Sequence, residues 1–293
     1  MARLISPANP FAGVQVDFNQ AKYVIFGFPY DLTSTYRFGS RHAPNAIREA
    51  SLNIETYSVR AGLYVEQLAI HDLGDLEVSG VADPFQELEA LFSRVYEAGK
   101  LPVVLGGEHT LTYSTAGSLS SDIALLIFDA HLDLRDSYEG RRFSHTTYLR
   151  RLIERRGNRG IFLLGVRAIS REEAEYAEKS GIEYFSALEV SRKSLEEVFD
   201  RVVRCLKGFT KLYVSLDMDV FDPAYAPAAS NPEPEGLTPT QVLDFFEALT
   251  SKFNLVGLDV VEFSPLYDNG VTAILASKLL FEFLCLIESR RGK

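Results

Sequence analysis

The segment Ile123-Ala-Leu-Leu-Ile-Phe128-Asp129-Ala-His131-Leu-Asp133 is the most informative part of the sequence. In it, an apolar run leads directly into three side chains that can ligate a metal. A short, continuous apolar run predicts a strand of a parallel sheet that helices cover on both faces. In such sheets, ligands bind beyond the carboxyl ends of the strands. The stretch therefore predicts both an α/β fold and the sheet edge at which a site should lie.

Two more clusters of polar side chains follow or end apolar runs in the same way. Leu212–Leu216 leads into Asp217-Met-Asp219, and Pro102–Leu105 is followed by Gly106-Gly107-Glu108-His109. Residues at i, i+2 and i+4 of an extended backbone point to the same side, so each cluster is expected to share a face. The strand ends should together deliver six ligands to one edge of the sheet: His109, Asp129, His131, Asp133, Asp217 and Asp219.

Apolar runs alternate with helical patterns along the whole chain, and no repeat or flexible linker separates them. This alternation predicts one domain over residues 1–293, a three-layer α/β/α sandwich with a central, mainly parallel β-sheet. Further strands are expected at 23–28, 68–72, 161–166 and 255–261. Helices are expected at 45–53, 84–98, 146–155, 171–179, 195–207, 239–251 and 271–289.

The composition restricts the classes of partner. A formal net charge of -10 argues against nucleic-acid binding, which depends on clustered Lys and Arg. Met1–Gln20 lacks the apolar core of a signal peptide, and Ala273–Ile287 is shorter than the roughly 20 residues of a membrane span. Cys205 and Cys285 are far apart in sequence, which is typical of buried thiols in a reducing compartment. We expect a cytoplasmic protein that acts on small molecules.

The ligand types predict a centre of two metal ions. A lone Asp or His at a strand end is usually a turn residue or a helix cap, but several such groups at buried strand ends would repel unless cations neutralised them. Four carboxylates and two imidazoles without a thiolate suit Mn²⁺ better than structural Zn²⁺, although Co²⁺, Ni²⁺ or Zn²⁺ could bind. We expect two Mn²⁺ ions per subunit. Two metals about 3.5 to 4 Å apart lower the pKa of bound water to around 7, which predicts hydrolysis by hydroxide.

Three motifs resemble the signatures of the ureohydrolases, the arginase and agmatinase family. They are Gly106-Gly107-Glu108-His109-Thr110, Asp129-Ala-His131-Leu-Asp133 and Ser215-Leu-Asp217-Met-Asp219-Val-Phe-Asp222-Pro. The resemblance continues in Phe38–Arg48 and in Val-Val-Glu262-Phe-Ser-Pro, so it covers nearly the whole chain. It implies that His109, Asp129, Asp133 and Asp217 bind the first metal. It also implies that His131, Asp129, Asp217 and Asp219 bind the second, with Asp129 and Asp217 bridging.

The same resemblance implies catalytic roles for His145 and Glu262. His145 lies where the family has a proton-shuttling histidine, and an imidazole with a pKa near 6.5 can give and take protons at neutral pH. Without the resemblance, a surface or helix-start histidine is the simpler interpretation. Glu262 ends a predicted strand and could hold a substrate guanidinium by two charge-assisted hydrogen bonds, or pair with an Arg of the chain. Glu108 is interpreted only as favouring the N-terminus of the following helix.

The substrate is harder to read from the sequence. Arg135 stands where arginases place an Asn, which disfavours arginine as the substrate. Asp136 or Glu139 could meet the ammonium tail of agmatine, whereas Arg135, Arg141 or Arg142 could serve an acidic substrate. The proline-rich loop Asp222–Gly236 departs from the family's usual Gly and Thr content. The expected substrate contacts are Glu262, Arg135, Asp136 and Asn231.

These observations predict an agmatinase-type amidinohydrolase, which converts agmatine and water to putrescine and urea. Arginase, guanidinobutyrase and formimidoylglutamase remain open on the same scaffold. A metal-dependent phosphoesterase is a more distant alternative, because such enzymes typically need an Asn-His pair that the chain does not show. A non-catalytic paralogue is the alternative from another class, although all six ligands are present. We expect a homo-oligomer, a trimer or a hexamer, with a small guanidino substrate and no nucleic-acid or membrane partner.

Overall fold

A nine-stranded sheet runs through the centre of the computed structural model, which describes residues 3–291. Across the sheet the strand order is β1-β5-β2-β6-β11-β10-β7-β8-β9. Among the described strands of this sheet, only the β1–β5 pair is antiparallel. The strands are β1 (Leu4–Ile5), β2 (Tyr23–Phe28), β5 (Ile70–Leu76), β6 (Leu101–Gly106), β7 (Ile123–Phe128), β8 (Ile161–Val166), β9 (Glu183–Ser186), β10 (Lys211–Asp217) and β11 (Asn254–Val261). A separate antiparallel pair joins β3 (Tyr57–Ser58) to β4 (Leu63–Tyr64).

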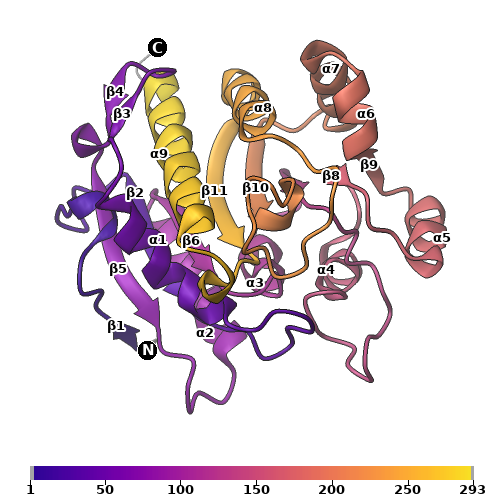
Figure 1. Cartoon of the computed structure of the whole chain (residues 1–293), viewed down its shortest axis with the longest axis horizontal. Coiled ribbons are helices and arrows are strands. Elements are labelled where there is room, and N and C mark those ends of the chain that lie inside the picture. Colours follow the sequence, from indigo (N-terminus) through magenta and orange to yellow (C-terminus); the bar gives the residue numbers. More distant parts are fainter. Residues whose placement is uncertain (1–2, 292–293) are drawn as a thin grey trace.

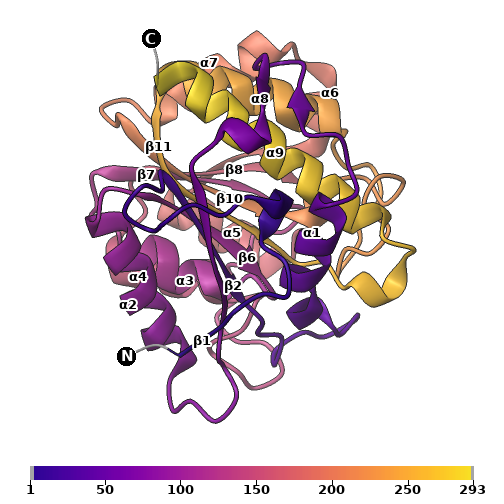
Figure 2. The same ribbon diagram turned by 90° about the vertical axis from the view of Figure 1, so that its left-hand side faces the viewer.

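Helices cover both faces of this sheet (Figures 1 and 2). The helices are α1 (Ala43–Ser51), α2 (Pro84–Glu97), α3 (Leu111–Thr115), α4 (Tyr148–Arg156), α5 (Arg171–Ser180), α6 (Ala187–Arg192), α7 (Leu195–Cys205), α8 (Pro239–Lys252) and α9 (Val271–Arg291). The buried apolar side chains of α1, α6, α7, α8 and α9 belong to one core cluster, and those of α2, α3, α4 and α5 to another. The expected three-layer α/β/α sandwich with a mainly parallel sheet is confirmed.

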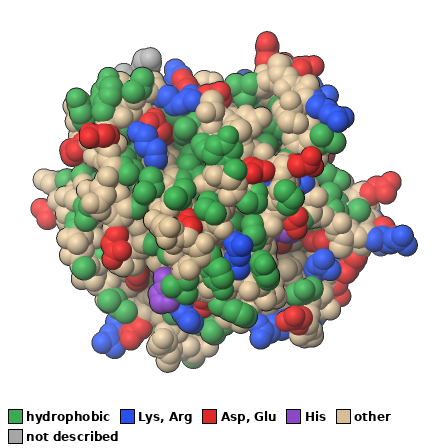
Figure 3. All heavy atoms as spheres, in the orientation of Figure 1, with side chains coloured by type: hydrophobic (Ala, Val, Ile, Leu, Met, Phe, Trp, Pro, Cys, Tyr) green, Lys and Arg blue, Asp and Glu red, His purple; other side chains and the backbone are tan. Residues whose placement is uncertain are grey.

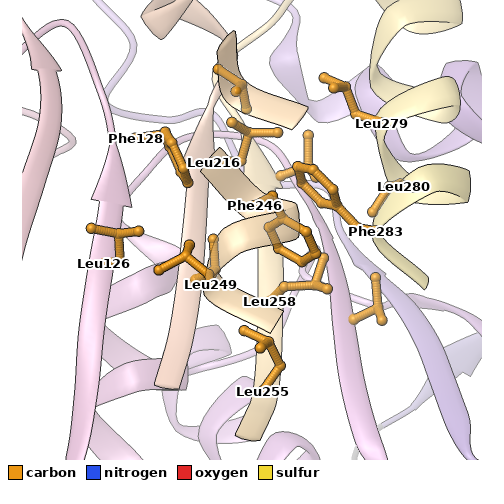
Figure 4. Close-up of a cluster of buried hydrophobic side chains, with 14 of the residues drawn as sticks. Leu126, Phe128, Leu216, Phe246, Leu249, Leu255, Leu258, Leu279, Leu280 and Phe283 are labelled. Atoms are coloured by element: carbon orange, nitrogen blue, oxygen red, sulfur yellow. The ribbon is translucent and has the colours of Figure 1, made fainter. Parts of the chain in front are cut away.

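The central strands are apolar at every position because both of their faces are buried. In β7, Leu126 and Phe128 point into the first cluster, while Leu125 and Ile127 point into the second. Figure 4 shows the first cluster, in which side chains of α8 and α9 pack over β7, β10 and β11. The rings of Phe246 and Phe283 stack there with their centroids 3.7 Å apart.

The elements expected from the sequence recur with small shifts at their ends. β2, β7 and β8 have the expected bounds, whereas β5 begins at Ile70 and continues to Leu76, and its buried positions alternate with half-buried ones. The sequence prediction missed β1, β3, β4, β9, α3 and α6. These elements are short, and β9 at the sheet edge buries only Phe185 of its residues. Since strands from Leu4 to Val261 share one sheet, we infer a single domain.

The surface mixes side chains of all kinds. On the face drawn in Figure 3, acidic and basic side chains are interspersed among apolar ones. Within residues 3–291, every helix is too short or too polar to cross a lipid bilayer.

Candidate active site

The six residues that the sequence predicts as metal ligands lie together at the carboxyl edge of the sheet. They follow or end β6, β7 and β10, of which β7 and β10 pair directly and β11 lies between β10 and β6. His109, Asp129 and Asp217 bring their ligand atoms within 4.8 Å of one another, and so do Asp129, His131 and Asp219. Asp129 thus belongs to both groups. Asp133 is in neither, but its Oδ2 lies 3.6 Å from Nδ1 of His109.

Several of these atoms approach one another without hydrogen bonding. Nδ1 of His109 lies 3.0 Å from Oδ2 of Asp217 and 3.2 Å from Oδ2 of Asp129. Nevertheless, this Nδ1 and Oδ2 of Asp129 are buried and have no hydrogen-bond partner within residues 3–291. Buried polar atoms normally have hydrogen-bond partners. Two unpartnered atoms that lie this close together are what ligands of a common cation would show. In the second group, Nδ1 of His131 lies 2.8 Å from Oδ2 of Asp219.

The charges of the site also fit bound cations. Burial raises the pKa of Asp217 well above its usual range, and the charge of Asp219 adds to the effect. Burial likewise raises the pKa of Asp133, with a further contribution from Asp129. Burial also acts to raise the pKa of Asp129, but the neighbouring imidazoles of His109 and His131 outweigh it and lower this pKa. The protein alone does not offset so many buried carboxylates, and two divalent ions would.

The backbone that carries these ligands is not extended, although the sequence analysis expected an extended segment after each strand. β7 ends at Phe128, Asp133 has a φ of 51°, and Asp219 lies in a 3-10 turn over Met218–Val220. The expectation of an extended backbone is therefore wrong. The physical reason is a pair of side-chain turns: Oδ1 of Asp129 accepts from the His131 N–H at 2.7 Å, and Oδ1 of Asp217 accepts from the Asp219 N–H at 2.8 Å.

The ring of His109 is held from the side opposite the carboxylates. Its Nε2 lies 2.9 Å from Oγ of Ser215 and 2.9 Å from the hydroxyl of Tyr148, and the Tyr148 ring stacks on the imidazole. Ser215 in turn donates to Asp259 at 2.5 Å. Such partners orient a ligating imidazole, and here they leave Nδ1 facing the carboxylates.

A cavity of about 710 Å³ opens above these groups. Arg135, Asn231, His145 and Glu262, which the sequence predicts as substrate or catalytic residues, line it. Asp136 does not, because its half-exposed carboxylate pairs with Arg151 at 2.8 Å outside the cavity. The lining also includes Thr35, Tyr36, His131, Asp133, Tyr138, Thr146, Arg167, Ala168, Ile169, Ser170, Glu173, Asp217, Asp219, Pro232 and Glu233.

Glu262 presents one free carboxylate oxygen in this cavity. Oε1 accepts from the His109 N–H at 2.7 Å, whereas Oε2 is buried and unpartnered within the described chain, residues 3–291. The backbone is strained, with a φ of 62°, and bonds to Gly107 and Ser230, both at 2.9 Å, hold it. Burial, together with the charge of Glu108, raises the pKa of Glu262 to about 8. A cation beside Oε2 would favour the ionised form.

His145 lines the same cavity but is only 4% exposed. Nδ1 lies 3.2 Å from Oγ1 of Thr33, and Nε2 lies 3.4 Å from Oγ1 of Thr35. Burial lowers the pKa of His145 to about 4, and the charges of His131 and His109 contribute. The expected pKa near 6.5 is therefore wrong for this structure, in which the ring is neutral at pH 7.

Sequence reasoning missed several residues at the site. Arg167, Glu173, Glu233 and Tyr36 line the cavity, although no motif marks them. Arg167 donates from all three guanidinium nitrogens to backbone carbonyls, those of Gly165, Asp219, Val220, Phe221, Glu233 and Pro234. Arg167 therefore holds the backbone of the loop that lies over it, a role that becomes visible only in the folded structure.

Known proteins resemble the chain along nearly its whole length. The model of the arginase family matches residues 21–286. An agmatinase of Pyrococcus horikoshii is 37% identical over 275 residues, which is 91% of this chain and 92% of that protein. An agmatinase of Bacillus anthracis is 35% identical over 276 residues, 91% of this chain and 92% of that protein.

Solved structures agree with these matches. The crystal structure of the agmatine ureohydrolase of Thermoplasma volcanium has a TM-score of 0.91 at 39% identity and covers 98% of this chain and 97% of that one. The native arginase from Bacillus caldovelox has a TM-score of 0.77 at 25% identity, covering 90% of this chain and 98% of that one. The chain therefore belongs to the arginase family and is an enzyme of the hydrolase class.

Proposed function

We propose that this enzyme is an agmatinase that uses two Mn²⁺ ions to hydrolyse agmatine to putrescine and urea. The observation that carries the proposal is the geometry of the cavity. Two groups of imidazoles and carboxylates share Asp129 beside it, and Glu262, whose Oε2 is buried and unpartnered among the described residues, lines the same space. Similarity to agmatinases of Pyrococcus horikoshii and Bacillus anthracis supports the same reading.

The two groups would divide the metal ligands between two ions. His109, Asp129 and Asp217 would hold one ion, with Asp133 beside them, and Asp129, His131 and Asp219 would hold the other. When bound, the ions would supply hydroxide at neutral pH by lowering the pKa of water. The oxygen-rich ligand set favours Mn²⁺.

The protein's own side chains would orient the substrate and move its protons. Glu262 would accept a hydrogen bond from the guanidinium on Oε2 and so fix the reacting carbon near the ligands. The guanidinium carbon is deactivated by resonance, and the amine can leave only when it is protonated. His145, which is neutral at pH 7, lines the cavity and would take the proton that the attacking water gives up and deliver it to the leaving nitrogen.

The charges along the cavity favour a cationic tail over a carboxylate. The guanidinium of Arg167 is already occupied by carbonyls, and Nε of Arg135 lies 3.8 Å from Oε2 of Glu173. Arg141 and Arg142 are not in the lining, whereas Glu173 and Glu233 are. Agmatine ends in an ammonium group, which the Glu233 carboxylate would attract.

A substrate panel tests the proposal. Mn²⁺-loaded protein is incubated with agmatine, arginine, guanidinobutyrate and formimidoylglutamate, and the product urea, or formamide for the last compound, is measured. We expect the highest kcat/KM with agmatine. Higher kcat/KM with arginine or an acidic compound would overturn the substrate assignment, and retention of metal without any product would favour the non-catalytic paralogue.

A substitution at Glu262 tests its role in the same assay. Glu262→Gln keeps the shape and can still accept from the His109 N–H, but it removes the charge that faces the guanidinium. Hydrogen bonds to charged groups contribute about 1.5–3 kcal/mol, so kcat/KM should fall by roughly 10²-fold. The matched control is Glu235→Gln, an exposed residue outside the lining. Equal kcat/KM in the two variants would remove Glu262 from the proposal.

Assembly into a trimer or hexamer and a cytoplasmic location stay predictions. Sedimentation of the purified protein would decide the first, and fractionation of the source cells would decide the second.

A further inference from the structure

Glu108 is a buried carboxylate that the proposed reaction does not use. It is fully buried, and its hydrogen-bond donors are uncharged: the Thr33 N–H at 2.7 Å, the Thr33 hydroxyl at 2.8 Å and the Thr110 hydroxyl at 2.7 Å. Its own N–H donates to the Tyr30 carbonyl at 2.8 Å. A buried charge without a cationic partner is costly, and the carboxylate is held here only by uncharged donors, of which the Thr33 N–H would be left unpartnered without it.

The neighbouring glycine lets Glu108 reach the loop that carries Thr33. A Cβ on Gly107 would lie 2.0 Å from the Tyr30 carbonyl oxygen, so only glycine allows this approach of the two backbones. The sequence interpretation of Glu108 as a residue that favours the following helix is incomplete, because its carboxylate is directed at Thr33 in a distant segment.

Thr33 connects Glu108 to His145. Its Oγ1 lies 2.8 Å from Glu108, accepts from the backbone N–H of His145 at 3.0 Å and lies 3.2 Å from Nδ1 of the ring. A threonine hydroxyl has one hydrogen and two lone pairs, and a carboxylate can only accept. Oγ1 of Thr33 donates to Oε1 of the ionised Glu108, which leaves the oxygen to accept from His145.

The direction of this relay determines where the proton of the neutral imidazole sits. Because Thr33 must accept, Nδ1 of His145 carries the hydrogen, and the lone pair is left on Nε2, on the side of Thr35. Thr35 lines the cavity, whereas Thr33 does not. Nε2 is then the atom that can take a proton and pass it to a group bound in the cavity.

We infer that Glu108 and Thr33 are positioning residues that hold His145 in the Nδ1–H tautomer with Nε2 available to the substrate. This inference rests on the proposed function for its effect on rate. The relay acts through His145, so it should affect kcat more than substrate binding. The wrong tautomer of a catalytic histidine is a known cause of large losses in kcat in other enzymes.

The first test is enzymatic and compares three variants with Mn²⁺-loaded wild-type protein acting on agmatine. Thr33→Val removes the hydroxyl but keeps the shape and the backbone N–H, so kcat should fall roughly 10²-fold with little change in KM. Thr33→Ser restores the hydroxyl and should recover most of kcat. Thr110→Val removes a donor from Glu108 without breaking the relay, and it should retain far more activity than Thr33→Val.

The second test does not depend on turnover. Nitrogen-15 chemical shifts of the His145 ring, in full-length protein loaded with diamagnetic Zn²⁺, report which nitrogen carries the proton. Wild type, Thr33→Ser and Thr110→Val should show the Nδ1–H form. Glu108→Gln can donate its amide to Thr33, which reverses the hydroxyl, and the ring should change to the Nε2–H form.

The two tests separate failure of the inference from failure of the proposed function. An unchanged tautomer in Glu108→Gln, or a Thr33→Ser variant as slow as Thr33→Val, would overturn the inference. If the wild type released urea from no guanidino compound, the agmatinase proposal would fail, while the shifts would still decide the tautomer.

Discussion

At the scale of single residues, Arg48 on α1 shows how a buried charge can hold several segments together. Its guanidinium binds both carboxylate oxygens of Asp72, at 2.8 and 2.9 Å, and Asp75 at 2.6 Å. Asp72 also accepts from the backbone N–H groups of Phe11 and Gly74. The N-terminal segment, α1 and β5 therefore all depend on one ion pair.

Replacing Arg48 should be strongly destabilising. Arg48→Met keeps the apolar stem but leaves the Asp72 carboxylate buried without its cation, which typically costs about 3–5 kcal/mol of unfolding free energy. Urea denaturation followed by circular dichroism measures this change. Arg3→Met is the matched control, because it breaks the pair with Glu77 in which Arg3 is 80% exposed, and little change is expected. Similar losses in both variants would contradict this account.

At the scale of elements, α9 is buried over most of its surface. It packs against α1 and α8, and its Leu279, Leu280 and Phe283 enter the core shown in Figure 4. A helix that is apolar on most sides belongs in the interior, which explains why this apolar segment is a core helix.

Truncating a side chain at the α8–α9 contact should lower the free energy of unfolding much more than truncating an exposed side chain of α9. Phe283→Ala removes a ring that stacks on Phe246 and should lower the free energy of unfolding by about 3–5 kcal/mol. Ile274→Ala on the same helix is the control, because Ile274 is 46% exposed and should change stability little. Thermal unfolding of both variants compares them. A small loss at Phe283 would show that the two helices do not share a tightly packed core.

At the scale of the whole molecule, the fold gathers acidic groups that destabilise one another. Residues after β6, β7 and β10 meet at one sheet edge, although they are far apart along the chain. Burial and mutual repulsion raise the pKa of Asp133 and Asp217 in this cluster. The folded state should therefore bind divalent cations much better than the unfolded chain does.

Metal removal should lower the stability of the whole protein. An ion that binds only the folded state at 100 times its Kd adds about 2.7 kcal/mol, so chelation with EDTA should lower Tm and added Mn²⁺ should restore it. Asp219→Asn should reduce this shift, whereas Glu235→Gln should retain it. Scanning calorimetry at several Mn²⁺ concentrations measures the effect. A Tm independent of metal in the wild type would contradict the predicted metal centre.

The layered architecture and the sheet edge where the site lies could be predicted from the sequence alone. Continuous apolar runs such as Ile123–Phe128 can be satisfied only by a strand that is covered on both faces, and polar residues directly after such a run must lie at its carboxyl end. These local patterns were sufficient to bring the six candidate ligands to one place. Their assignment to two Mn²⁺ ions stays a prediction.

The directions of individual side chains, in contrast, could be learned only from the complete fold. The left-handed backbone at Asp133 and the 3-10 turn at Asp219 accompany side-chain turns at Asp129 and Asp217, which a strand pattern does not encode. Asp136 has the expected charge but pairs with Arg151 outside the cavity, while Thr33 reaches His145 over a sequence separation of 112 residues. Periodicity reports which face of an element is buried. Which loop lies over that element depends on packing and hydrogen bonds between distant segments, and these form only in the complete fold.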